Sequence, residues 1–199
     1  MDQFTMAETQ TTSRGTAAKY AIETRLSRFT VQAFAGGILA AVGHSPVIAI
    51  RDFSGEIRLE PDALEHSSMH LKIRADSLSV ISDSSDKDRR EIERQMNTEV
   101  LETDHYPEII FDAQQVSATR AGDGYYSVSL SGDLHLHGVM RSLTIPAQLN
   151  VTGEMLRASG NFTIRQTEYG IKLVSVAGGV LKVKDELKFN FDIVARRQD

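Results

Sequence analysis

Strict alternation of apolar and polar residues is the feature that most limits what this chain can fold into. Five stretches show it, over residues 69–75, 128–136, 143–151, 156–164 and 187–193. Successive side chains of a β-strand point to opposite faces, so a period of two with one apolar face is typical of a half-buried strand. The alternation therefore predicts a fold dominated by strands that each bury one face.

Short turn segments separate the strands in the second half of the chain. Gly122-Asp-Gly124, His137-Gly138 and Gly153-Glu154 stand between long amphipathic runs. Connections this short join antiparallel neighbours in a meander. Less regular strands are expected over residues 20–26, 29–34, 53–59 and, with its buried face left open, 109–116.

About eight such strands, closed into an antiparallel barrel, enclose an interior just wide enough for side chains or for one ligand. Small residues recur at the expected inward positions, namely Gly55, Ala75, Gly132, Ala147, Ala158 and Gly160. If they leave volume unfilled among Leu, Ile and Phe, the interior stays dry and accepts an apolar guest. The alternative is a filled barrel, because small barrels also alternate small and large residues to fit their taper.

One segment departs from the period of two and predicts an inserted amphipathic helix. Ser84 or Ser85 can cap its start, and the acidic residues that follow favour the first turns through the helix dipole. Ile92, Met96 and Val100 form one apolar stripe, which we expect to pack on the barrel as a lid. The charged run over residues 86–94 is expected to be a solvated face with ion pairs four residues apart, such as Asp86–Arg90.

Composition excludes several classes of function. The net charge of -5 gives no general attraction for phosphate backbones, so nucleic acid is not expected as a partner. The chain has no cysteine, which rules out disulfides, thiolate catalysis and Cys-ligated metal sites. Residues 1–19 are polar and lack the basic and apolar regions of a secretory signal, so we expect a disordered leader, one domain over residues 20–199 and a cytoplasmic protein.

Three segments resemble sequence motifs of the YceI-like proteins. Tyr106-Pro-Glu-Ile-Ile-Phe111 is similar to their YP-x-I-x-F strand entry, and Gly132-Asp-Leu-His-Leu-His-Gly-Val139 to their G-x-L-T-L-H-G-V hairpin. Phe53-Ser-Gly55 is similar to their F-x-G strand. The order and spacing agree, and the resemblance covers roughly residues 20–196.

The resemblance implies a lipocalin-like barrel that binds polyisoprenoids, isoprenoid quinones or fatty-acid-like amphiphiles in its lumen. Members are often periplasmic, and this chain departs from that habit because no signal is seen. It also departs in the apolar connection over residues 35–45, and His135 stands where threonine is usual. A bound lipid is therefore expected, with no other cofactor.

The candidate ligand-binding residues are apolar side chains on the expected inward faces. They are Met69, Leu71, Ile73, Leu130, Leu134 and Ile145. The inward aromatic residues Phe162, Phe189 and Phe191 are expected to anchor the lipid tail. The glycine-punctuated segment Gly36–His44 is expected at the mouth, either as an entry lid or as a static helical plug.

No arrangement of residues indicates catalysis. His135 and His137 are expected on one outward face of one strand, where they could supply two metal ligands but no third. His66 and His70 are expected on one exposed strand face, and Ser45 beside His44 is no catalytic pair. We therefore expect a binding or carrier protein, not an enzyme.

Two alternatives stay open at this point: an enzyme that uses histidines and carboxylates at the barrel mouth, and a filled-barrel interaction module. The expected partner is a hydrophobic small molecule. Transient membrane contact and homodimerisation also stay open.

Overall fold

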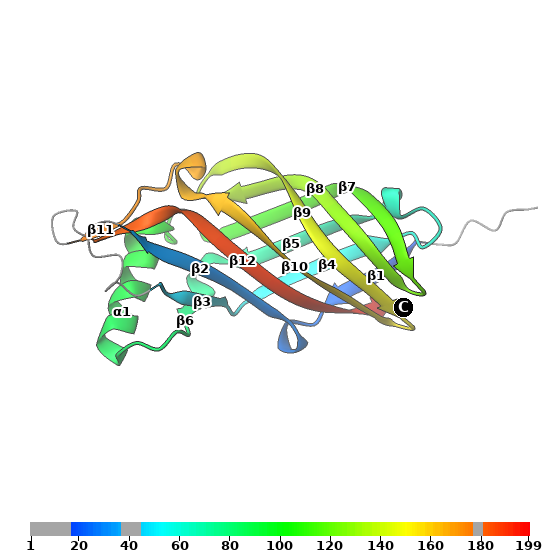
Figure 1. Ribbon diagram of the computed structural model, residues 1–199, viewed down its shortest axis with the longest axis horizontal. Helices are drawn as coiled ribbons and strands as arrows, with labels where there is room; N and C mark the ends of the chain where they lie inside the picture. The colour runs from blue at the N-terminus through cyan, green and yellow to red at the C-terminus, as the bar shows by residue number, and fades with distance from the viewer. Residues whose placement is uncertain (1–16, 37–44, 177–180) are drawn as a thin grey trace, which may run out of the picture.

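A computed structural model describes residues 17–36, 45–176 and 181–199, and its centre is a closed ring of antiparallel strands (Figure 1). In order around the ring these are β1 (Ala18–Ile22), β4 (Phe53–Leu59), β5 (Ser68–Arg74), β7 (Glu108–Gly122), β8 (Tyr125–Leu136), β9 (Val139–Thr152), β10 (Met155–Arg165) and β12 (Leu181–Gln198). β1 closes the ring because it pairs with β4 on one side and with the end of β12 on the other, Lys19 opposite Gln198. The predicted closed antiparallel barrel is confirmed.

Two strands share the position beside β12. β1 ends at Ile22, the short 3-10 turn η1 (Thr24–Leu26) follows, and β2 (Arg28–Gly36) continues along the same edge of β12. Ser27 Oγ accepts a hydrogen bond from the backbone N–H of Val194 at 2.9 Å. This bond takes the place of the backbone acceptor that Val194 on β12 loses where the turn interrupts the neighbouring strand. The expected strand over residues 20–26 is therefore wrong beyond Ile22.

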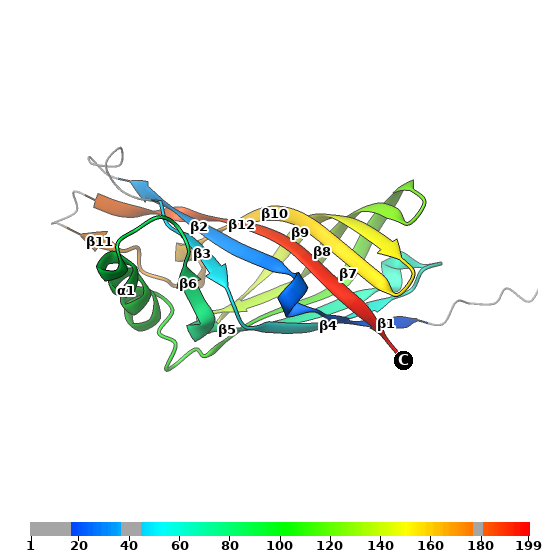
Figure 2. The same ribbon diagram turned by 90° about the horizontal axis from the view of Figure 1, so that it is seen from below.

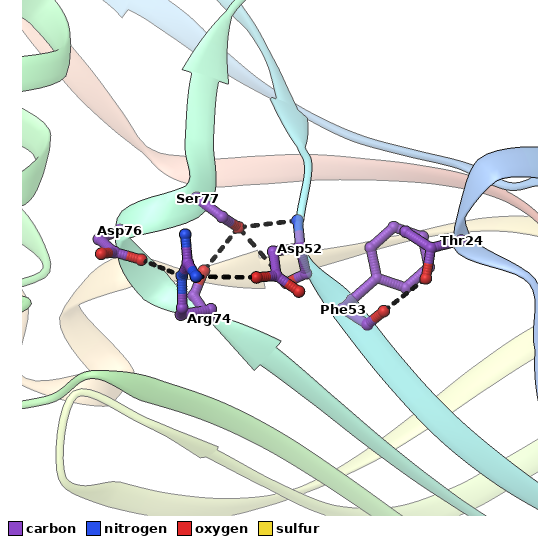
Figure 3. Close-up of polar contacts among 6 residues, drawn as sticks. All are labelled: Thr24, Asp52, Phe53, Arg74, Asp76 and Ser77. Carbon is purple, nitrogen blue, oxygen red and sulfur yellow. Dashed lines mark hydrogen bonds and ion pairs between the residues drawn. The ribbon is translucent and has the colours of Figure 1, made fainter.

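At one end of the barrel, two strands bend away from the ring. β3 (Val47–Ile50) leads into β4, and β5 leads through the turn η3 (Ala75–Ser77) into β6 (Leu78–Val80). β3 pairs with β2 on one side and with β6 on the other. Figure 3 shows the contacts at the bend: the Arg74 guanidinium lies 3.0 Å from Asp52 and 2.7 Å from Asp76. The hydroxyl of Ser77 accepts from the Asp52 N–H at 3.0 Å. Both strands are thus held at the point where they leave the ring.

The predicted helix is present as α1 (Asp86–Gln95), continued by a π-turn (Met96–Val100). Ser85 caps it, since its hydroxyl accepts from the Asp88 N–H at 3.1 Å. α1 lies at the end of the barrel opposite to β1 and the C-terminus (Figure 2). Glu93 accepts from the N–H of Val80 at 2.8 Å and so binds an edge of β6 that no described strand pairs.

The ion pairs on α1 differ from the expected spacing of four residues. Arg89 pairs with Asp86 at 3.6 Å and Arg94 with Glu91 at 2.7 Å, three residues apart in both cases. Pairs at this spacing also meet on a helix surface. The Asp86–Arg90 pair is therefore wrong, although the solvated charged face is present.

The remaining elements are short connections. They are η2 (Leu64–His66), η5 (Gln166–Tyr169) and β11 (Ser175–Val176), which pairs with β12. β1 begins at Ala18, inside the segment that the sequence analysis assigns to a leader. The rest of that leader lies outside the described residues. So does the proposed lid segment, except for Gly36, which ends β2.

Two apolar clusters divide the interior of the barrel. The smaller cluster lies towards β1 and the C-terminal end of β12, and it includes Tyr20, Leu59 and Leu156. A small void of about 50 Å³ lies among its side chains. The larger cluster lies towards α1, and there the side chains leave a cavity between them. The barrel is therefore filled at one end and hollow at the other.

A candidate ligand-binding cavity

The cavity at the α1 end has a volume of about 520 Å³, within the range of about 300–1,000 Å³ that small-molecule sites occupy. Its walls come from the inward faces of the ring strands, from β2 and β3, and from α1 with its π-turn. Side chains of Leu, Ile, Val, Phe and Met make most of the lining. An interior of this kind is suited to an apolar ligand.

All the candidate residues named from the sequence lie in the wall of this cavity. Met69, Leu71 and Ile73 reach it from β5, Leu130 and Leu134 from β8, and Ile145 from β9. Leu71, Ile73, Leu134 and Ile145 are buried, while Met69 and Leu130 are partly buried. Strand alternation placed them on the inward face, and the structure brings them to one space.

Several wall residues come from outside the regular meander and are not among those predicted from the sequence. Phe29 and Val31 of β2 and Ile48 of β3 line the cavity, as does Ile171 after η5. The alternation in β2, where Phe29, Val31 and Ala33 are all buried, was a signal that could have identified the first of these. Nothing in the sequence indicated that β3 would fold over the same space.

Phenylalanine rings gather along one wall. The rings of Phe162 and Phe189 are stacked, with centroids 4.8 Å apart and planes at 7°. Phe29 lies 6.1 Å from Phe189 and 6.4 Å from Phe191, in tilted and edge-on contacts. All four rings line the cavity, including the three expected from the sequence. Stacked and edge-on pairs of this kind favour a fixed arrangement of the wall.

The small inward residues do not create the cavity, contrary to the sequence-based argument. Of those named, only Ala158 lines it. A Cβ at Gly55 would lie 2.5 Å from the carbonyl oxygen of His70, and one at Gly160 would lie 2.8 Å from the ring of Phe191. At Gly132 it would collide with the backbone of Asp112. These glycines allow close approach of neighbouring strands and rings, and the hollow arises elsewhere.

Polar side chains line the cavity at only a few positions. Asp88, Glu91 and Gln95 project from one side of α1, Lys182 lies near the start of β12, and Gln166 follows β10. The later turns of the same helical segment contribute Ile92, Met96 and Val100 instead. The apolar stripe predicted from the sequence therefore lines the cavity, with polar side chains of α1 beside it.

The expected histidine pair on one strand face is wrong. β8 ends at Leu136, and His137 has a positive φ of 52° in the turn that follows. Its Nε2 lies 2.8 Å from Glu102, and its Nδ1 lies 3.3 Å from the carbonyl oxygen of Tyr169. His135 stays on the exposed face, so the two rings point to different surroundings.

His66 and His70 also lie outside the cavity. His66 belongs to η2 and not to a strand, while His70 on β5 lies 2.6 Å from Asp112 on the outer face. Both are exposed. Within the described residues, no group of three His, Cys, Asp or Glu side chains is placed to hold a metal ion. No helix in this part of the chain is long and apolar enough to cross a membrane.

Comparison with known proteins identifies the family to which this barrel belongs. The model of the YceI-like domain matches residues 18–195. The chain belongs to the YceI-like family. A search of curated protein sequences gives no significant match.

Solved structures share the fold at low sequence identity. The crystal structure of BcnA from Burkholderia cenocepacia has a TM-score of 0.67 at 16% identity, covering 87% of this chain and 98% of BcnA. A polyisoprenoid binding domain from Saccharophagus degradans, implicated in plant cell wall breakdown, has a TM-score of 0.67 at 12% identity, covering 90% and 98%. A YceI protein from Campylobacter jejuni has a TM-score of 0.56 at 13% identity, covering 76% and 85%.

Two of the segments that resemble YceI-like motifs meet in the structure. The ring of Tyr106, just before β7, lies 4.5 Å from the ring of His137 after β8. Gly138 has a φ of 73°, and a Cβ there would lie 2.7 Å from the Tyr106 ring. The aromatic residue of one motif thus packs on the glycine turn of the other, which links the start of β7 to the β8–β9 hairpin.

Proposed function

We propose that this YceI-like protein binds one long-chain amphiphile, of the isoprenoid or a related lipid class, with the apolar chain inside the barrel. One observation carries the proposal: the hollow end of the barrel is a single space of about 520 Å³ walled almost entirely by hydrocarbon side chains. An apolar chain gains by leaving water for such a space. The similar structure from Saccharophagus degradans, a polyisoprenoid binding domain, supports the isoprenoid class.

The energetics of such a complex are sufficient. Burying about ten methylene groups contributes roughly 8 kcal/mol, at about 0.8 kcal/mol for each group. Loss of translational and rotational freedom offsets several kcal/mol of this gain. The remainder corresponds to a dissociation constant of the order of micromolar or tighter.

The chemistry of the wall favours binding and carriage over catalysis. The stacked Phe162 and Phe189 and the aliphatic side chains of β5 and β8 can hold a lipid tail, but hydrocarbon groups transfer no protons. The charged lining residues Asp88, Glu91 and Lys182 are solvent-exposed on α1 and β12. We therefore propose that the protein carries or stores its lipid without changing it.

Mass spectrometry of an organic extract from the purified protein tests whether a lipid co-purifies. The protein stripped of lipid is then titrated with farnesol and with a fatty acid, using displacement of a fluorescent apolar reporter. We expect an extractable lipid and saturable binding with one site for each chain. Absence of any extractable lipid, together with no binding of either probe, would overturn the proposal.

A pair of variants on β10 locates the site. Ala158 lines the cavity, so Ala158→Phe should fill part of it and weaken binding of the probes by at least tenfold. Thr163 lies on the exposed face of the same strand, so Thr163→Phe adds the same ring outside and should bind as the wild type does. Equal binding by both variants would place the lipid elsewhere.

A further inference from the structure

Gln166 is the one cavity-lining residue in the described chain that is both polar and buried, with 4% of its surface exposed. It follows directly after β10 and keeps the inward parity of Phe162 and Ile164. A buried amide among apolar side chains is costly unless its polar atoms are bonded. Its hydrogen bonds therefore show what the cavity offers to a polar group.

One half of this amide is already fixed by the fold. β12 has an irregularity between Val183 and Leu187 that interrupts its pairing with β2. The carbonyl oxygen of Lys184, in this interruption, accepts from Gln166 Nε2 at 2.9 Å. Because a carbonyl oxygen can only accept, this bond also fixes which end of the amide carries the nitrogen.

A neighbouring contact holds the same turn in place. The carboxylate of Asp185 accepts from the N–H of Thr167 at 2.9 Å and from its hydroxyl at 2.8 Å. η5 is thus attached to the interrupted part of β12 at two successive residues. The side chain of Gln166 therefore has little freedom to rotate. Within the described residues, its Nε2 is hydrogen-bonded and its Oε1 is not.

We infer that Gln166 Oε1 accepts a hydrogen bond from a hydroxyl on the head of the bound lipid, so that the ligand is an uncharged long-chain alcohol or phenol. The inference rests on the proposed function. With the head beside Gln166, the tail extends along the phenylalanine wall towards the filled end of the barrel.

The charges around the cavity agree with an uncharged head. A buried ionic head requires a counter-charge, since an isolated charge is strongly disfavoured away from water. The charged lining residues are exposed on α1 and β12, and Glu91 is already paired with Arg94 at 2.7 Å. Beside Gln166 an amide oxygen can accept a hydrogen bond from a hydroxyl but cannot neutralise a carboxylate. The one cation among the described lining residues, Lys182, is exposed.

Three probes with the same tail separate the contributions: farnesol, its methyl ether, which lacks the hydroxyl proton, and farnesoic acid, which is ionised at neutral pH. We expect farnesol to bind about tenfold more tightly than the ether, as one hydrogen bond to a buried acceptor allows. We expect farnesoic acid to bind less tightly than farnesol. A carboxylate that binds as well as the alcohol would overturn the inference.

The variant Gln166→Met keeps the length of the side chain and removes the acceptor. It should bring the ratio of farnesol to ether affinity close to one while leaving the affinity for the ether within about threefold of wild type. Gln148→Met, which removes an exposed amide on β9 outside the cavity, is the matched control and should keep the ratio of the wild type. An unchanged ratio in Gln166→Met would overturn the inference.

A measurement on the wild-type protein keeps the test valid if Gln166→Met does not fold. The side-chain amide signals of Gln166 in NMR should shift on binding farnesol more than on binding the ether, and equal shifts would contradict the assignment. The proposed function has a separate outcome, because it fails only if neither farnesol nor its ether binds to the wild-type protein. Binding of both without discrimination leaves the carrier function in place and removes Gln166 from head recognition.

Discussion

At the scale of single residues, the wall of the cavity depends on which face each side chain takes. Phe162 and Phe189 stack only because both strands present them inward from positions directly opposite one another. Asn161, one position earlier on β10, is exposed. One step along the strand thus separates a ring in the wall from a side chain in water.

Exchange of each of these neighbours for a charged residue tests the face assignment. Phe162→Asp should abolish folding or binding, because it removes the stacked ring and places a carboxylate in an apolar wall, with a cost of more than about 3 kcal/mol. Asn161→Lys should change the free energy of unfolding by less than about 0.5 kcal/mol. Chemical denaturation and reporter displacement measure both, and equal effects would refute the assignment.

Two turn glycines make a second matched pair at this scale. Gly138 and Gly153 both have positive φ, 73° and 57°, so alanine is strained at either position. A Cβ at Gly138 would also lie 2.7 Å from the ring of Tyr106, whereas one at Gly153 meets nothing within 4 Å. Gly153→Ala should cost about 1–2 kcal/mol, and Gly138→Ala about 1–3 kcal/mol more.

Urea unfolding of the two glycine variants gives the comparison directly. A Gly138→Ala variant no less stable than Gly153→Ala would show that Tyr106 moves aside freely. The packing of the two motif segments would then contribute little to stability.

At the scale of whole elements, the clean alternation of β5, β8, β9, β10 and β12 was enough to predict their inward faces, although β8, β9 and β12 extend beyond the predicted runs. β7 was left ambiguous for a physical reason: its pairing with β8 has an irregularity between Ala113 and Gln115. Phe111 and Ala113 are buried before it, and Val116 is buried after it. The buried parity changes within the strand, so a single period of two cannot describe it.

The cavity itself was harder to predict than the strands. Alternation identified candidate wall residues, but the hollow depends on distances between strands that are remote in the sequence. The glycines show this, since each close approach involves a neighbouring strand that no local pattern reveals. Gln166 was missed for a similar reason: its significance comes from the carbonyl of Lys184 on another element.

The attachment of η5 to β12 predicts a dependence of stability on pH. Hydrogen bonds from the backbone and hydroxyl of Thr167 lower the pKa of Asp185 below its ordinary value. A lowered pKa in the folded state means that this stabilisation is complete above the ordinary pKa of about 3.9 and is lost as pH falls through the lowered value.

Melting temperatures at pH 7 and pH 3 test this attachment. Asp185→Asn should lower the melting temperature at pH 7 and should reduce the difference between the two pH values. Asp123→Asn, at an exposed hairpin tip, is the control and should keep the difference of the wild type. An identical pH dependence in the wild type and in Asp185→Asn would contradict the role of the carboxylate.

At the scale of the whole molecule, one end of the barrel is solid and the other hollow, so a bound lipid should stabilise the two ends unequally. At a free ligand concentration of 100 times the dissociation constant, the folded state gains about 2.7 kcal/mol. For a chain of this size, that should raise the melting temperature by roughly 5–10 °C.

Hydrogen exchange locates that stabilisation. Farnesol should slow amide exchange in α1 and at the α1 end of β5 and β8, whose side chains line the cavity. The β9–β10 turn near Gly153 lies at the opposite end and should exchange at an unchanged rate. Uniform slowing over both ends would contradict a ligand confined to the hollow part.

Closure of the ring depends on β1 meeting the last residues of β12. Lys19 lies opposite Gln198 and Ile22 opposite Ala195, so these contacts join segments almost a full chain length apart. The entropy of bringing such distant segments together must be lost before the contacts repay it, and proteins rich in non-local pairs accordingly refold in milliseconds to seconds. The β8–β9 and β9–β10 hairpins, whose partners are adjacent in sequence, should form early, and the seam between the first and last strands should be the final part of the sheet to gain protection during refolding.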